Sequence, residues 1–99
     1  MNINIKQNGD KTEVAISGKL DSTTAPLLKE KLIPLFADSK YVEIDLAGLF
    51  YVSSAGLQIL LMGEKTAKKQ GSKQTLLNVS PEVLEVFEMT GFSGILDIS

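Results

Sequence analysis

Eighteen consecutive residues of this chain, residues 46–63, carry no charge. A run of this length is about the lower limit for a helix that spans a membrane, and otherwise it must be buried inside a fold. Gly48, Gly56 and the Ser53–Ser54 pair interrupt the run. These interruptions favour a strand, a turn and a buried helix over one continuous helix. We therefore expect no membrane insertion.

Alternating apolar and polar residues predict five strands. Residues 2–7 and 12–17 alternate on either side of the turn sequence "NGDK", which is typical of a hairpin. Residues 41–46, "YVEIDL", and residues 73–79, "KQTLLNV", predict two further strands. Residues 94–98, "GILDI", predict a short last strand.

Helical periodicity predicts three helices between the later strands. The first covers residues 25–36, with a threonine cap before it and Pro34 expected to kink or tighten its last turn. The second runs from about residue 54 to residue 70, and the third begins at Ser80–Pro81. The side chains expected to point inward are Leu28, Leu32, Leu35, Phe36, Leu57, Leu60, Leu61, Ala67, Val83, Leu84 and Phe87.

The predicted element order is ββαβαβαβ, which is typical of an α/β fold. Its 99 residues are enough for one domain, residues 1–99, and no linker divides them. Helices between successive strands call for parallel neighbours, so we expect a mixed central β-sheet covered by about three helices. Crossovers of this kind are right-handed.

Composition excludes several classes of function. The net charge is −2, with 10 lysines, no arginine and 12 carboxylates, so nucleic acid is not an expected partner. The absence of cysteine and histidine removes thiolate metal sites and the commonest general base. No P-loop spacing is present, so no cofactor is expected. The polar N-terminus is unlike a signal peptide and predicts a cytoplasmic protein.

The Ser53–Ser54 pair allows three interpretations. One serine is an N-cap of the helix that follows. Alternatively, one is a catalytic nucleophile, but the chain lacks a Gly-x-Ser-x-Gly elbow, a histidine base and a Ser-x-x-Lys spacing at either serine. In the third interpretation a serine accepts a phosphate, because a helix N-terminus stabilises an anion.

Three stretches resemble the motifs of STAS domains, most closely those of bacterial anti-sigma factor antagonists. They are "SGKLDSTTAP", "EIDLAGLFYVSSAGLQILL" and "VFEMTGFSGILDI", and their order and spacing extend the resemblance over nearly the whole chain. The second resembles the family's D-S-[ST]-G-L segment, in which the serine after the Asp is phosphorylated. Alignment on Gly56 and Leu57 makes Ser54 that serine, with Ser53 in the Asp position and Ala55 in place of a frequent second hydroxyl.

This resemblance implies a partner switch rather than an enzyme. The unphosphorylated chain is expected to bind an anti-sigma factor that is also a serine kinase of the GHKL type. Phosphorylation of Ser54 blocks that binding, and a PP2C-type phosphatase restores it. The partner-binding residues that the resemblance implies are Asp21, Ser22, Ser53, Ser54, Gly56 and Leu57. The alternative is a STAS interaction subunit of another signalling or lipid-transport complex, not linked to a sigma factor.

Overall fold

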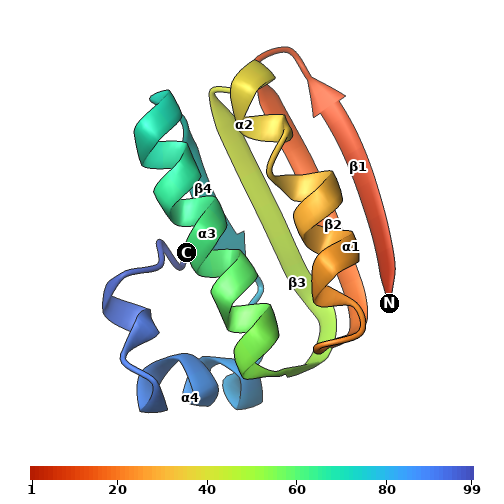
Figure 1. The fold of residues 1–99 in the computed structure, drawn as a ribbon, viewed down its shortest axis with the longest axis vertical. Coiled ribbons are helices and arrows are strands. Elements are labelled where there is room, and N and C mark those ends of the chain that lie inside the picture. Colours follow the sequence, from red (N-terminus) through yellow and green to blue (C-terminus); the bar gives the residue numbers. More distant parts are fainter.

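Four strands form one mixed sheet in the computed structural model, which describes all 99 residues (Figure 1). The sheet order is β1-β2-β3-β4, with β1 and β2 antiparallel and the β2–β3 and β3–β4 pairs parallel. The strands are β1 (Asn2–Asn8), β2 (Lys11–Leu20), β3 (Tyr41–Val52) and β4 (Lys73–Leu77). The predicted hairpin and the parallel neighbours are therefore confirmed.

The helices begin at or within one residue of the predicted positions. They are α1 (Ala25–Leu32), α2 (Leu35–Asp38), α3 (Ser54–Gln70) and α4 (Pro81–Met89), with a 3₁₀ turn, η1 (Phe92–Gly94), after α4. Figure 1 shows α1, α2 and α3 lying across one face of the sheet. Pro34 divides the predicted first helix into α1 and α2, because proline lacks the N–H that a continuous helix needs.

The core lies between that face of the sheet and the helices. Alternate residues of the central strands, such as Val14 and Ile16 on β2 and Ile44 and Leu46 on β3, are almost fully buried there. Their neighbours in sequence point to the opposite face, where they are exposed or half-buried. Helices therefore cover only one face of the sheet.

One predicted strand is absent, and the ends of the other strands differ from the prediction by up to six residues. Residues 94–98 form no strand of the sheet, because η1 occupies the first of them and only Ile98 bridges to Leu76. The strand predicted over residues 41–46 continues to Val52, so β3 carries the chain directly to the serine pair.

Three leucines that were expected to point inward are only half-buried. Leu35 and Leu84 still pack against the core, but Leu61 does not, and it lies near the outer face of α3. This leaves an apolar side chain on a surface that is otherwise polar.

Candidate functional site

The two loops that resemble family motifs meet at one end of the sheet. β2 and β3 are parallel neighbours, and Leu20 lies opposite Val52 where the two strands end. Just beyond, the Ser53 backbone N–H donates a hydrogen bond of 2.8 Å to the Leu20 carbonyl oxygen. This bond places Asp21 and the serine pair side by side at one end of the sheet.

The two serines differ in what their hydroxyls do. Ser53 has extended backbone angles, φ −94° and ψ 174°, and is the N-cap of α3. Its hydroxyl oxygen accepts a hydrogen bond of 3.4 Å from the Gly56 backbone N–H. Ser54 is the first residue of the helix and is exposed. The capping interpretation therefore belongs to Ser53, and the hydroxyl of Ser54 remains accessible.

The surroundings of Ser54 suit a negative charge. The first turn of α3 contains no acidic residue, and its backbone N–H groups carry the positive end of the helix dipole. A phosphate on a serine at the start of a helix can accept hydrogen bonds from the N–H groups that have no partner there. The third interpretation of the serine pair is thus compatible with the geometry.

Asp21 organises the loop that leads into α1. Its Oδ1 accepts hydrogen bonds from the Thr23 N–H at 2.9 Å, the Thr23 hydroxyl at 2.6 Å and the Thr24 N–H at 3.2 Å. The hydrogen bond from the Thr23 hydroxyl is the main cause that holds the pKa of Asp21 below its usual range, and the bond from the Thr23 N–H is the second. Thr24 is the N-cap by position, but its hydroxyl donates to the Lys19 carbonyl instead of capping α1.

Gly56 and Leu57 support the site from inside the fold. A Cβ on Gly56 would lie 2.6 Å from Leu20 Cγ, so α3 can approach the end of β2 only with glycine at this position. Leu57 is 2% exposed and belongs to the core. Leu20 of this chain fills the space beside Gly56, so the lack of a side chain at this position serves packing within the fold.

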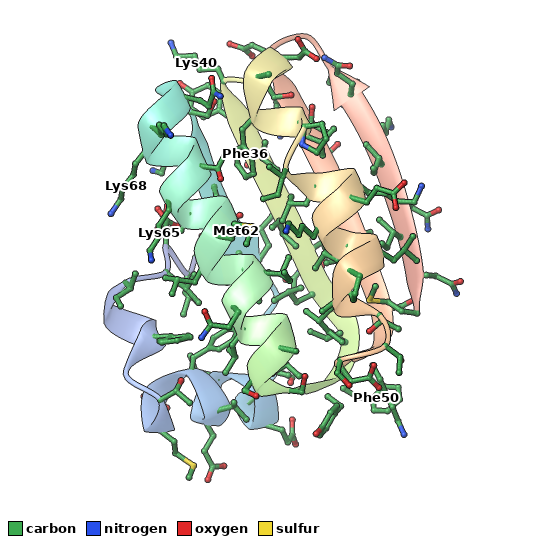
Figure 2. All side chains as sticks on the ribbon, viewed as in Figure 1. Phe36, Lys40, Phe50, Met62, Lys65 and Lys68 are labelled. Atoms are coloured by element: carbon green, nitrogen blue, oxygen red, sulfur yellow. The ribbon has the colours of Figure 1, made fainter.

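The structure adds two residues that the sequence reasoning missed. Phe50 is 64% exposed and Tyr51 is 49% exposed, although both lie in the uncharged run that was expected to be buried. Figure 2 labels Phe50 at the end of the molecule where α3 begins. Leu49 and Val52 are both buried and lie three residues apart, so the strand alternation is broken here. All four residues from 49 to 52 are apolar, so the sequence carried no signal of this break.

The site is a surface and not a pocket. The two hollows of the surface are lined by residues of the open sheet face and by residues at the far end of β3, and neither includes Asp21 or residues 53–57. A docking surface with an exposed hydroxyl and exposed aromatic rings suits a protein partner better than a small substrate. None of the helices is long and apolar enough to cross a membrane.

The family is decided by comparison with known proteins. A family model described as "Mlab, STAS domain" matches residues 3–97. The chain belongs to the STAS domain family. A relative named anti-sigma-B factor antagonist, from Bacillus subtilis (strain 168), is 37% identical over 99 residues, which are 100% of this chain and 91% of the relative.

Solved structures share the STAS fold. The anti-sigma factor antagonist SpoIIAA in its unphosphorylated form superimposes with a TM-score of 0.84 at 17% identity, covering 99% of this chain and 88% of that one. The Bacillus cell fate determinant SpoIIAA in its phosphorylated form gives a TM-score of 0.78 at 16% identity, covering 99% and 91%. At these identities the likeness is one of fold.

Proposed function

We propose that this STAS domain is an anti-sigma factor antagonist that works as a phosphorylation-controlled partner switch. The unphosphorylated chain binds an anti-sigma factor that is also a serine kinase, and a phosphate on Ser54 blocks that binding. The observation that carries the proposal is the contrast between the serines: Ser53 caps α3, whereas Ser54 is exposed at the first residue of the helix.

The names of two relatives support an anti-sigma factor as the class of partner. The Bacillus subtilis relative, 37% identical, and a 30% identical one from Listeria monocytogenes are both named anti-sigma-B factor antagonists. In each case nine-tenths of the relative or more is covered by this chain, so the likeness extends over the whole domain. We infer the same class of partner for this chain.

The physical basis of the switch is charge at a docked surface. A phosphoserine carries about −1.5 to −2 charges at neutral pH and three acceptor oxygens. The free chain accommodates it, since the start of α3 presents N–H donors to solvent. A partner bound over Ser54 would remove water from that phosphate, on the same surface as the carboxylate of Asp21. Burying such a charge without a cation to pair with it costs about several kcal/mol.

The classes of kinase and phosphatase in this proposal are those that the resemblance to anti-sigma factor antagonists implies. A GHKL-type kinase would transfer the γ-phosphoryl group of ATP to the Ser54 oxygen, leaving ADP, and a PP2C-type phosphatase would hydrolyse the phosphoserine. Asp21, Ser22, Ser53 and Ser54 would supply the polar contacts, with Phe50 and Tyr51 as apolar anchors. The chain would act in the cytoplasm as ligand and substrate.

The test is phosphate mapping by mass spectrometry after incubation with ATP and the anti-sigma factor encoded by the same genome. We expect one phosphate, on Ser54, and none on the Ser54→Ala variant. Ser53→Ala is the matched control and should still be phosphorylated. Phosphate on Ser53 alone would overturn the assignment of Ser54. No phosphate on either serine would favour the other interpretation, a subunit of a signalling or lipid-transport complex that does not switch.

A further inference from the structure

The outer face of α3 carries a row of lysines in line with Ser54. Lys65 follows Ser54 by 11 residues, which is three helical turns, and Lys69 follows by 15 residues. At 100° per residue, Lys65 and Lys69 lie about 20° and about 60° around the helix from Ser54 in one direction. Lys68 lies about 40° from Ser54 in the opposite direction. All three lysines are exposed, and Figure 2 shows Lys65 and Lys68 projecting outward from α3. We call these three residues the α3 lysines.

None of the α3 lysines forms an ion pair within the chain. The two ion pairs in the structure join Lys11 to Glu43 at 3.3 Å and Lys73 to Asp97 at 3.5 Å. Two of the α3 lysines, Lys68 and Lys69, lie in the last turn, where positive charge also suits the negative end of the helix dipole. The lysines thus form a patch of positive charge on a chain whose net charge is −2.

Apolar side chains join the α3 lysines to the candidate site. Leu61 and Met62 lie between Ser54 and Lys65 along the helix and are half-buried, and Leu61 does not pack against the core. This helix face therefore presents the hydroxyl of Ser54, then the exposed amide of Gln58 and the half-buried Leu61, and then unpaired positive charge, while Met62 packs against the core. An apolar centre with a charged rim is the usual composition of a protein interface.

We propose that the surface docking the anti-sigma factor continues along α3 from Ser54 to the α3 lysines, and that it takes an acidic surface of that partner. This inference rests on the proposed function. The rise of the helix places the lysines about 16–22 Å from Ser54, so the partner must present carboxylates at that distance from the groups that contact the serine. The lysines steer and hold the partner, while Ser54 switches the contact on and off.

A second copy of this chain could also present an acidic surface to the α3 lysines. Glu82, Glu85 and Glu88 are exposed on α4, at intervals of three residues that place them on one side of the helix. We favour the anti-sigma factor, because the α3 lysines are continuous with the surface around Ser54, whereas the acidic row lies on a different helix. Self-association is therefore an outcome that the experiment must separate.

The experiment measures association of the full chain with the same anti-sigma factor by stopped flow, across a range of salt concentrations. The variant Lys65→Glu/Lys69→Glu should associate about tenfold more slowly at low salt, since charges at a rim act mainly on the association rate. The difference should shrink as salt is raised, because interactions between exposed charges are screened within about 10 Å at 0.1 M salt. Phosphorylation of Ser54 by the kinase should remain detectable.

A matched control separates this effect from a change in net charge. Lys29→Glu/Lys31→Glu makes the same change at two exposed lysines in the last turn of α1. We expect less than a twofold effect on the association rate from the control, as is usual for charges outside an interface. Equal slowing by both variants, or no slowing by either, would overturn the inference and leave the proposed function standing.

Two further outcomes are distinguishable. If the wild-type chain does not bind the anti-sigma factor at all, the proposed function fails, and this inference fails with it. In the other outcome, sedimentation shows that the wild-type chain self-associates and that Lys65→Glu/Lys69→Glu abolishes this self-association. If the same variant associates with the anti-sigma factor as fast as the wild-type chain does, the α3 lysines bind a second copy and the inference is wrong.

Discussion

Neighbouring serines have separate tasks at the start of α3. Ser53 is extended and turns its hydroxyl back to the Gly56 N–H, whereas Ser54 is already helical and faces solvent. A cap must sit outside the helix to reach the third residue of the first turn, so only one of two adjacent serines can hold that position. The other is left free for a partner or a kinase.

Unfolding of alanine variants should separate the two roles. We expect Ser53→Ala to lower the free energy of unfolding by about 1 kcal/mol, because it removes the cap of α3. Ser54→Ala should change it by less than about 0.5 kcal/mol, as is usual for an exposed side chain without partners. Urea unfolding followed by circular dichroism measures both. A larger loss for Ser54→Ala than for Ser53→Ala would contradict the assignment of the cap.

The stability that the Asp21 carboxylate gives to the fold should depend on pH in the acid range. Hydrogen bonds from the Thr23 hydroxyl and N–H hold the pKa of Asp21 below its usual value of 3.8 in the folded chain. A lowered folded-state pKa means that the carboxylate stabilises the fold above the unfolded value and loses this effect as the pH falls through the folded value.

We therefore expect Asp21→Asn to be less stable than the wild-type chain at neutral pH, because the amide is a weaker acceptor than the carboxylate. The difference should shrink once the pH falls below the usual range for aspartate. Urea midpoints of both proteins over a series of acid pH values provide the measurement. A difference in stability that does not change with pH would show that the charge of Asp21 has no part in holding the loop.

At the scale of the elements, local signals in the sequence located most boundaries. Ser53 and Ser80 accept hydrogen bonds from N–H groups three residues later, and Gly71 takes left-handed angles to end α3, so each boundary is fixed by its own residues. Contacts between distant segments were not predictable in this way. The need for glycine at position 56 comes from Leu20, which is 36 positions earlier in the chain.

The candidate site shows the same division. The positions of Asp21 and Ser54 followed from motifs, but the exposure of Phe50 and Tyr51 depends on how β3 pairs with β2. The register between these strands shifts twice, between Ala15 and Ser17 and between Gly18 and Lys19. Such irregularities change which side chains face outward, and alternation along one strand does not reveal them.

The contact between α3 and β4 gives a prediction at this scale. Gln74 is fully buried beneath α3, where its Nε2 donates a hydrogen bond of 3.0 Å to the Leu60 carbonyl oxygen. A Cβ on Gly63 would overlap Gln74 Oε1. Gly63→Ala should therefore destabilise the wild-type chain by about 1–3 kcal/mol, although alanine favours a helix over glycine by about 1 kcal/mol.

The same substitution in a Gln74→Ala background should be neutral or stabilising, because the obstructing amide is gone. The four proteins form a double-mutant cycle, and we expect a coupling of at least about 1 kcal/mol between positions 63 and 74. Additive effects of the two substitutions on the free energy of unfolding would mean that the packing of Gln74 is not the reason why position 63 requires glycine.

At the scale of the whole molecule, the sheet orders its loops so that function gathers at one end. β2 and β3 run parallel and finish together, which brings the starts of α1 and α3 to the same edge (Figure 1). A rigid sheet beneath two short loops is a common way to hold a binding surface in place. Ser54 already faces solvent, so a kinase can reach its hydroxyl without a change of fold.

The most direct test of the switch is the affinity of two forms of one chain for the anti-sigma factor, measured by isothermal titration calorimetry. One form is unmodified, and the other carries phosphate on Ser54 alone, as verified by mass spectrometry. We predict that the phosphate weakens binding by at least about 100-fold, which several kcal/mol of unpaired charge would produce. Phosphatase treatment should restore the affinity. Equal affinity of the two forms would contradict the central claim that phosphorylation of Ser54 controls the partner.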